Sequence, residues 1–499
     1  MRVRCHIATM ALSAAALLVG SAIALADPNP RYKPGDWRAF TSLRFVTSAA
    51  EAPDYVYFGT RGGVARFDRY ARRWATPLTT AEGLPSNDIQ RLAYNPDTDE
   101  LFAQTPAGYS VFRRVWDEWR YSPSFPDSLV RPWAEPRIEG WYLPRGYDVL
   151  TEGYFTDPHL RSYRIAGAIE DSYGNVWIGT WGDFVWRQPY AGFDLEPQEW
   201  GLFHDNVAAI FLDSGKVFFG GPTYYTTEGA LSIYDTVNST WQYIEARYVD
   251  GFATDAIYQF AGTPDGKTLW MATDLGVVRY DRASGRFRTY GRSRGLTDDR
   301  VNTICLDGDF LWVGTESGVD AIYLPNDSAF SATSSEVGNA RVRAIAAARD
   351  VVWLGTDRGL FRLVKPAAEW TRYDRADGAF ARSVRSLVVH DGHLYVGMER
   401  GIGVIDLNLR DPARVYESVD GLPDDNVFSL AVTDSILWAA TRSGLVRFVP
   451  ATRERRVFTV DDGMLSNLVQ VIQVDGDYLW LGTEKGANRF RWRNPERID

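Results

Sequence analysis

Cysteine and histidine are scarce in this chain, and their scarcity excludes several kinds of site. The 499 residues contain two cysteines and five histidines. Cys5 lies in an N-terminal segment that we expect to be removed, so Cys305 has no partner for an internal disulfide. One cysteine cannot build a thiolate zinc cluster. The sequence also has no Gly-x-Ser-x-Gly elbow and no phosphate-binding glycine loop before a helix. We therefore expect no metal, no cofactor and no catalytic residue.

Runs of basic residues are also missing. The chain has 54 Lys and Arg residues against 64 Asp and Glu residues, which gives a formal net charge of -10. Proteins that bind nucleic acids usually carry a basic patch or stripe, and this sequence has none. A nucleic-acid partner is therefore not expected.

Long apolar runs occur only at the N-terminus. Two arginines precede an apolar run from Ile7 to Ala26, and its last three residues form a small-x-small cleavage motif. We predict a signal peptide over residues 1–26, cleaved after Ala26, and a periplasmic or secreted mature protein over 27–499. The alternative is an uncleaved membrane anchor, because the run approaches the length of a membrane span. No later stretch is long and apolar enough to cross a membrane.

One pattern recurs ten times: an apolar strand that ends in an aromatic residue followed by small residues, usually Gly-Thr. The clearest copies begin at Trp177, Trp312, Trp353 and Trp480. From position 270 onward the aromatic anchors fall at 270, 312, 353, 395, 438 and 480. A period in the low forties built from short strands is typical of propeller blades. The sequence therefore predicts an all-β fold, a β-propeller of four-stranded antiparallel blades with about ten repeats.

The links between repeats are equally regular. A glycine lies six residues before a β-branched residue in most links, as in Gly295 and Val301. We expect these glycines to adopt positive φ where the chain turns into the next blade. Because the spacing after Trp270 is unbroken, we favour a single large ring over two smaller rings. Residues 36–40 resemble an outer strand, so we predict that residues 36–41 pair with residues 485–493 and close the last blade.

Three segments resemble the repeats of two-component regulator propellers. They are Leu311–Thr315, Gly276–Asp281 and Asp420–Val427, and the resemblance extends over about residues 37–492. In relatives, such propellers often form the extracytoplasmic sensing part of a membrane-bound histidine kinase. After the last repeat this chain has only residues 492–499, so the resemblance implies a sensing component for a separate membrane protein.

The pattern is interrupted between the anchors at Phe102 and Trp177, which lie 75 residues apart. The extra residues, at about 122–163, are rich in proline and aromatic residues, so we expect them to pack onto the ring. Topology predicts that this insert, the turn at residues 181–183 and the expanded turn at residues 220–229 share one face. Aromatic patches often mark binding sites, although a structural cover is the alternative. The candidate ligand-binding residues are Trp133, Trp141, Tyr142, Tyr147, Asp148, Arg161, Trp181, Asp183, Tyr224, Tyr225 and Glu228.

The sequence leaves three functions open. The first is an exported, non-enzymatic propeller that binds a small molecule, a glycan or an envelope protein, which includes a sensing role for a separate membrane protein. The second is a scaffold between envelope proteins. The third is a carbohydrate-active or lyase-type enzyme that uses carboxylates of the insert. The acids that recur in the links, such as Asp205 and Asp299, are expected to hydrogen-bond within turns.

Overall fold

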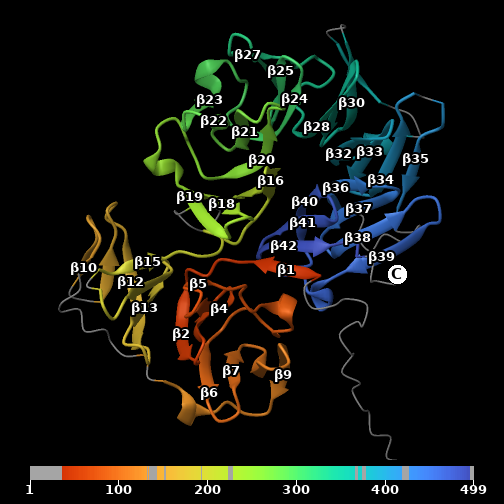
Figure 1. The fold of residues 1–499 in the computed structure, drawn as a ribbon. Coiled ribbons are helices and arrows are strands. Elements are labelled where there is room, and N and C mark those ends of the chain that lie inside the picture. Colours follow the sequence, from red (N-terminus) through yellow and green to blue (C-terminus); the bar gives the residue numbers. More distant parts are fainter. Residues whose placement is uncertain are drawn as a thin grey trace, which may run out of the picture.

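The computed structural model describes residues 36–131, 133, 143–150, 153–192, 194–222, 229–365, 369–373, 378–408, 410–417 and 426–494. Over these residues the protein is all-β, with ten antiparallel sheets (Figure 1). Nine sheets have four strands, and the tenth has six. The predicted propeller fold with about ten blades is confirmed. No helix among the described residues is long and apolar enough to span a membrane.

The residue pattern of one blade explains how it forms. One blade consists of β36 (Val427–Thr433), β37 (Ile436–Thr441), β38 (Gly444–Val449) and β39 (Glu454–Phe458). Trp438 of its second strand is 1% exposed and packs between blades. The Thr441 hydroxyl donates to the Gly444 carbonyl oxygen at 2.8 Å and closes the turn between the second and third strands. Gly444 has φ 135°, and a Cβ atom there would lie 2.3 Å from the Phe458 carbonyl oxygen. The recurring Thr and Gly are therefore turn residues that the blade needs.

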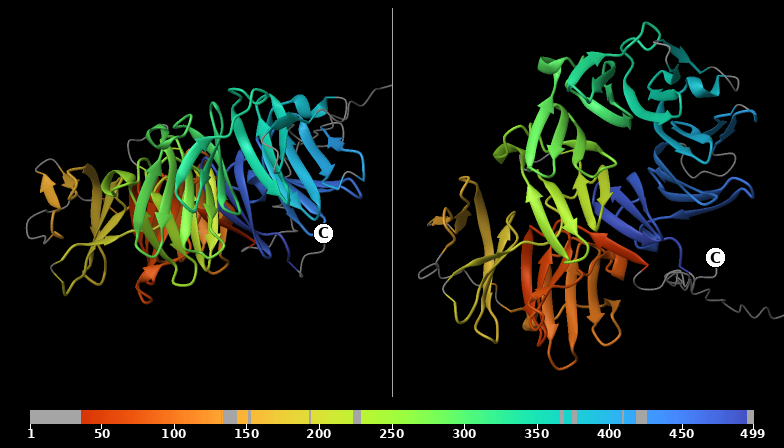
Figure 2. Two further views of the ribbon diagram at one scale, coloured as in Figure 1. Left: turned by 90° about the horizontal axis from the view of Figure 1, so that it is seen from above. Right: turned by 45° about the horizontal axis from the view of Figure 1, so that its top comes forward.

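Seven blades form a closed ring (Figure 2). Their innermost strands pack in the order β16, β20, β24, β28, β32, β36 and β40, and β40 then packs against β16. The Val207 backbone N–H donates to the Thr483 carbonyl oxygen at 2.8 Å, across this last contact. The ring strands are β16 (Ala209–Asp213), β17 (Lys216–Gly220), β18 (Leu231–Asp235), β19 (Thr240–Ile244), β20 (Ile257–Gly262), β21 (Thr268–Thr273), β22 (Gly276–Asp281), β23 (Arg286–Tyr290), β24 (Val301–Asp307), β25 (Phe310–Thr315), β26 (Gly318–Tyr323), β27 (Ser328–Ser331), β28 (Val342–Ala348), β29 (Val351–Thr356), β30 (Gly359–Val364), β31 (Trp370–Arg372), β32 (Val384–His390), β33 (His393–Met398), β34 (Gly401–Asp406), β35 (Arg414–Tyr416), β36 (Val427–Thr433), β37 (Ile436–Thr441), β38 (Gly444–Val449), β39 (Glu454–Phe458), β40 (Val469–Asp475), β41 (Tyr478–Thr483) and β42 (Gly486–Arg491).

The other three blades form an arc beside the ring. Strand β2 lies in the middle of the arc, packed against β6 on one side and against β12 and β13 on the other. The arc strands are β2 (Val46–Glu51), β3 (Tyr55–Thr60), β4 (Gly63–Asp68), β5 (Arg73–Trp74), β6 (Arg91–Asn95), β7 (Glu100–Thr105), β8 (Gly108–Arg113), β9 (Glu118–Ser122), β10 (Asp148–Leu150), β11 (Tyr154–Thr156), β12 (Ser162–Glu170), β13 (Val176–Trp181), β14 (Val185–Gln188) and β15 (Glu196–Gln198). The prediction of a single large ring is therefore wrong. The three arc blades are inserted in the chain between the ring strands β1 (Trp37–Phe40) and β16, so the ring closes without them.

Strand β1 closes the last blade of the ring, as predicted. It pairs with β42, in the register Trp37 to Phe490 through Phe40 to Ala487. The ring of Trp37 stacks on that of Phe490, with centroids 4.2 Å apart. Strand β1 thus supplies the outer strand of this blade, beside β42.

The links between blades also match the sequence prediction. The link glycines have positive φ, for example 105° at Gly295 and 109° at Gly463. Short 3-10 helices precede several of them, at Thr80–Glu82, Arg292–Arg294 and Val460–Asp462. Two of the recurring acids bond within their links: Asp255 and Asp299 accept the backbone N–H groups of Ala246 and Arg292, both at 2.7 Å, as expected. Asp205 instead accepts the backbone N–H group of Ser42 at 2.6 Å, from a distant part of the chain.

The insert crosses the arc. The blade that precedes it, β6 to β9, and the blade that follows it, β10 to β15, lie on opposite sides of β2. The 3-10 helix Asp127–Leu129 packs on β6, and Arg131 pairs with Glu51 at the end of β2. Insert residues 148–150 and 154–156 add strands β10 and β11 to the inner edge of β12. Residues 132, 134–142 and 151–152 of the insert lie outside the described residues, so its predicted position on one face of the propeller stays a prediction.

Candidate functional site

Each inner strand of the ring from β20 to β40 begins with a β-bulge. In β28, for example, Val342 pairs with Thr356 and Ala344 pairs with Gly355, so Arg343 has no partner residue. The same break in register occurs in β20, β24, β32, β36 and β40. A bulge turns one side chain out of the regular alternation of a strand. The bulge residues of the ring are Tyr258, Asn302, Arg343, Arg385, Phe428 and Gln470.

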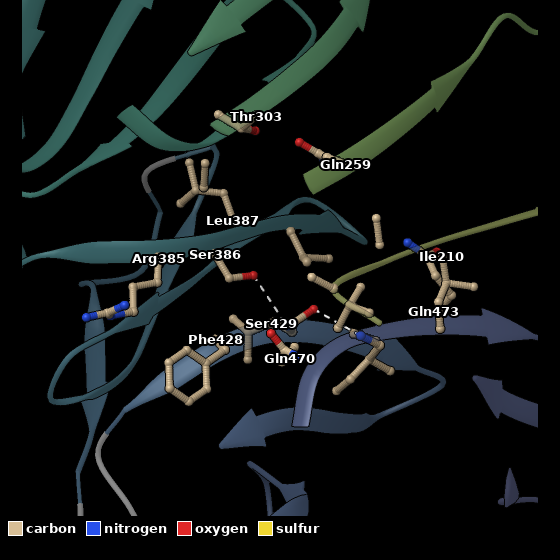
Figure 3. A pocket seen from close by; sticks show the side chains of 18 of the residues that line it. Ile210, Gln259, Thr303, Arg385, Ser386, Leu387, Phe428, Ser429, Gln470 and Gln473 are labelled. Carbon is tan, nitrogen blue, oxygen red and sulfur yellow. Dashed lines mark hydrogen bonds between the residues drawn. The ribbon is translucent and has the colours of Figure 1, made fainter. Parts of the chain in front are cut away.

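These six side chains line the central channel of the ring. The channel is a cavity of about 440 Å³ whose walls come from all seven inner strands. Figure 3 shows Arg385 and Phe428 toward one end of this cavity and Gln473 toward the other. At the end that holds Arg385, an adjoining hollow of about 380 Å³ is also lined by Arg442 and Leu468. We call this end the mouth; Arg442 belongs to a turn between the second and third strands of its blade.

Polar side chains join neighbouring inner strands below the mouth. The Ser386 and Ser429 hydroxyls accept the backbone N–H groups of Leu430 and Ile472 at 3.1 and 3.2 Å (Figure 3). Gln259 accepts the N–H of Ile304 at 2.9 Å in the same way. These bonds satisfy backbone groups on strand edges that would otherwise face the channel, and they fix the blades around it.

Two of the bulge residues hydrogen-bond to the neighbouring blade and so stabilise the ring. The Asn302 side-chain amide donates to the Val342 carbonyl oxygen at 3.1 Å, which lies in the next blade. The Gln470 amide donates to the Asn206 side-chain oxygen at 2.8 Å, across the contact between β40 and β16. The bulge position can therefore act as a clamp between blades.

The arginines at the bulge position differ from these amides. An Nη atom of Arg385 donates to a Glu399 carboxylate oxygen at 3.0 Å. Arg343 has no hydrogen bond or ion pair within the described part of the chain, and its Nε atom is buried without a partner. Burial, with a contribution from the charge of Arg385, lowers the pKa of Arg343. Among the described residues that line the channel and its mouth, the charged side chains are Arg343, Arg385 and Arg442.

An aromatic face completes the mouth. The Phe428 ring lies beside Arg385, whose guanidinium carbon is 5.6 Å from the ring centroid. Phe428 is half-buried, so part of its ring is open to the cavity. The mouth thus combines positive charge, amide and hydroxyl groups and one apolar face, which is a set of groups suited to binding.

Of the residues that the sequence nominated as a site, five lie outside the described residues: Trp141, Tyr142, Tyr224, Tyr225 and Glu228. The turn that contains the last three starts beside the mouth. There, the Asn206 amide that is bonded to Gln470 also donates to the Pro222 carbonyl oxygen at 3.0 Å. The proposed role of these residues in binding stays a prediction.

The described aromatic residues of the nominated site pack against the arc. Trp133 lies over Gly167 and Gly179, where added Cβ atoms would come within 2.0 and 2.6 Å of its ring. Tyr147 packs edge-on against Trp186 at 4.8 Å, and Trp181 packs edge-on against Phe45 at 5.4 Å. Asp148 is exposed on β10. These four nominated residues are therefore spread over the arc, and their role in binding also stays a prediction.

Arg161 and Asp183 lie where the arc meets the ring. Arg161 pairs with Asp157 of the insert at 2.5 Å and with Glu245, which follows ring strand β19, at 2.6 Å. The Asp183 carboxylate accepts the indole N–H of Trp186 at 3.2 Å, and desolvation raises its pKa to about 7. We call this junction, with Arg44 and His204, the joint.

Two stretches of chain cross the joint side by side. The Leu202 backbone N–H donates to the Thr41 carbonyl oxygen at 2.9 Å, and an Arg44 Nη atom donates to the Phe203 carbonyl oxygen at 3.2 Å. Desolvation lowers the pKa of His204 to about 4. The joint is therefore a packed and partly ionic connection between the two bodies.

Sequence reasoning missed the bulge residues, although a signal for them exists. Each follows directly after the β-branched residue that ends a link, as Arg343 follows Val342. When the repeats are aligned, this position varies in charge and size, whereas the residue before it is always Ile or Val. A variable position in a constant frame is a place to look for function.

Metal binding has no candidate among the described residues. No group of three or more His, Cys, Asp or Glu side chains within them could hold an ion. Cys305 lies in β24, and burial raises the pKa of its thiol to about 11.

Comparison with known proteins agrees with the blade pattern. A family model described as two component regulator propeller matches residues 159–182, which hold β12, β13 and the turn between them. The chain carries a two-component regulator propeller repeat. A search of curated proteins gives no match.

Two solved structures share the fold of the chain. PorZ, a bacterial surface component of the type-IX secretion system of Porphyromonas gingivalis, aligns over 92% of this chain and 87% of its own, at 14% identity and a TM-score of 0.67. The extracellular domain of BT3049 from B. thetaiotaomicron, described as a hybrid two component system, aligns over 91% of this chain and 68% of its own. Its identity is 16% and its TM-score 0.51. At such identities the similarity concerns the fold.

Proposed function

We propose that this protein is a non-enzymatic binding propeller that acts outside the cytoplasm and holds its ligand at the mouth of the seven-blade channel. The observation that carries the proposal is the set of bulge residues. Six side chains of five residue types occupy one structural position around one cavity, whereas the surrounding turns and cores repeat from blade to blade. Function grafted onto a repetitive scaffold is expected at such positions.

The chemistry of the mouth favours binding over catalysis. General acid–base catalysis most often uses a His, Asp or Glu side chain, and less often Lys, Tyr or Cys, within reach of the reacting group. The described residues that line the channel offer guanidinium, amide, hydroxyl and aromatic groups. The Glu399 carboxylate already accepts a hydrogen bond from Arg385.

The location outside the cytoplasm rests on the N-terminal segment and on the similar structures. Residues 1–26 have the pattern of a signal peptide, PorZ is a surface component, and the BT3049 domain is extracellular. Similarity to the BT3049 domain favours one form of the proposal, in which the protein senses a ligand for a separate membrane protein.

A thermal-shift screen with a matched variant tests the proposal. The full chain, Phe428→Ala and the control Tyr121→Ala are heated with neutral sugars, acidic sugars, small organic acids and envelope extracts. Tyr121 is 77% exposed on the arc, away from the mouth. A compound that binds the mouth raises the midpoint of the native chain and of the control, and not that of Phe428→Ala. Equal midpoint shifts in all three proteins would mean that the compound binds away from the mouth. If no compound shifts the midpoint of the native chain, the proposal is overturned.

Export is tested separately. The chain is expressed with its own N-terminus in a bacterial host, and the cells are fractionated. We expect a periplasmic or secreted protein that begins at Asp27, as read by mass spectrometry of the intact chain. A protein that stays in the cytoplasm with residues 1–26 attached would contradict this part of the proposal.

A further inference from the structure

Arg343 and Arg385 occupy the same bulge position in neighbouring inner strands, β28 and β32. Both line the channel and its mouth. We infer that they hold the acidic group, a carboxylate or a phosphate, of a small organic molecule whose ring lies on Phe428. This inference rests on the proposed function and specifies the ligand class.

The acidic side chains around Arg343 are bonded to another arginine, which leaves the Arg343 guanidinium available to a ligand. Two acidic residues whose charges act on the pKa of Arg343, Glu316 and Asp357, are engaged by Arg341. Glu316 pairs with the Arg341 Nε atom at 2.5 Å, and Asp357 accepts the Arg341 backbone N–H at 3.0 Å. Asp357 stands in the same turn position as Glu399, which pairs with Arg385 in the next blade. Arg343 therefore lacks the partner that Arg385 has.

The uncompensated charge is costly without a ligand. Arg343 is half-buried, its Nε atom is enclosed without an acceptor, and the neighbouring Arg385 has the same sign. Enclosing a cation without a partner is unfavourable, and an anion between two guanidinium groups removes both the repulsion and the missing hydrogen bonds. The lowered pKa of Arg343 agrees with this arrangement.

A structural role does not account for Arg343. At the same position in other blades, Asn302 and Gln470 donate to oxygen atoms of the next blade and hold the ring together. Arg343 makes no such bond within the described residues, although its neighbouring strand β32 offers the same backbone. Within the described part of the chain, the Arg343 side chain therefore does not join two blades as Asn302 and Gln470 do.

The rest of the mouth fits a ring-bearing acid. Phe428 follows Arg385 at the bulge position of the next strand, β36, and offers its face at the mouth. A cavity of about 440 Å³ has room for a small molecule with one ring. Stacking on Phe428 and charge-assisted bonds to the arginines would then fix the two ends of the ligand.

Matched probe pairs test the inference by calorimetry and thermal shift on the full chain. The probes are benzoate and phenyl phosphate against benzyl alcohol, and galacturonate against galactose. The variants are Arg343→Gln and Arg385→Gln, with Arg120→Gln as a control, because Arg120 pairs only with Glu118 on the arc surface. We expect an acid to bind the native chain and the control, and to bind each mouth variant about 10-fold or more weakly. Arg343→Lys should restore part of the affinity, which a merely misfolded variant would not do.

Each outcome decides the inference. Preference for benzoate or for phenyl phosphate identifies which acidic group fits. Equal binding of benzyl alcohol and benzoate, or acid binding that survives in Arg343→Gln, overturns the inference. So does the failure of every acid to bind. In these cases the proposed function still stands if another compound gives a shift that Phe428→Ala abolishes, so the two failures can be told apart.

Discussion

Replacing Asp183 by asparagine tests the electrostatics of the joint. The Asp183 carboxyl group accepts one hydrogen bond, from the Trp186 indole at 3.2 Å. Desolvation raises its pKa from 3.8 to about 7, although the charge of Arg44 offsets part of this effect. Between these two pH values the folded protein keeps a proton that the unfolded chain releases. Stability therefore falls as the pH rises through this window and is level above it.

The size of the effect follows from the width of the window. Each pH unit costs about 1.4 kcal/mol, so a shift of roughly three units corresponds to about 4 kcal/mol. Asp183 keeps some contact with solvent, and we therefore expect about half of this, ~2 kcal/mol. Asparagine is neutral at every pH and keeps an oxygen atom for the Trp186 indole. About two of the three units of this window lie above pH 5, so the Asp183→Asn variant should gain roughly 1.4 kcal/mol relative to the native chain between pH 5 and pH 8.

Urea unfolding followed by tryptophan fluorescence, at pH 5, 6.5 and 8, measures the difference. Asp148→Asn is the control, since Asp148 is exposed on the same sheet. His204 titrates in the opposite sense, because its lowered pKa makes the fold weaker as the pH falls from 6.5 toward 4. That contribution is common to both proteins and cancels in the difference. A stability difference that stays constant from pH 5 to pH 8 would refute the reasoning.

Two further predictions concern the ring. Trp37→Ala removes the stack on Phe490 and should cost about 3–5 kcal/mol, as large-to-small core changes do. Hydrogen exchange should then rise in β42 and stay unchanged in arc strand β7, and equal exchange in both strands would contradict the role of β1 as the closing strand. Cys305, with a thiol pKa of about 11 against 9.0 for a free thiol, should react with iodoacetamide at pH 8 about 100-fold more slowly than in the urea-unfolded chain. A similar rate in both states would mean that the thiol is not desolvated.

The sequence predicts the blades well because the residues that determine one blade are close together in the sequence. The aromatic anchor such as Trp438, the Thr and Gly of the next turn and the link glycine all act within about forty residues. The closure by β1 was also predictable, since Trp37 belongs to a segment that looks like an outer strand and the last blade needs one.

The grouping of the blades was not predictable, because it depends on contacts between distant residues. The contact that closes the ring joins Val207 to Thr483, and nothing in the repeat period distinguishes it from a contact between consecutive repeats. The mouth was missed for another reason. Simple alternation along β28 assigns Arg343 to a regular position in the sheet, and only the bulge turns its side chain toward the channel.

The arc is attached to the ring at the strand that closes it. Strand β1 ends at Phe40, and the chain enters the joint at once, with Thr41 bonded to Leu202 of the returning stretch. No spacer segment separates β1, which closes the ring, from the joint, which connects the arc to the ring. A force on the arc therefore reaches the ring through β1, through the returning stretch that leads into β16 and through the Arg161–Glu245 ion pair. Movement of the three-blade arc is therefore coupled to the strand that closes the seven-blade ring.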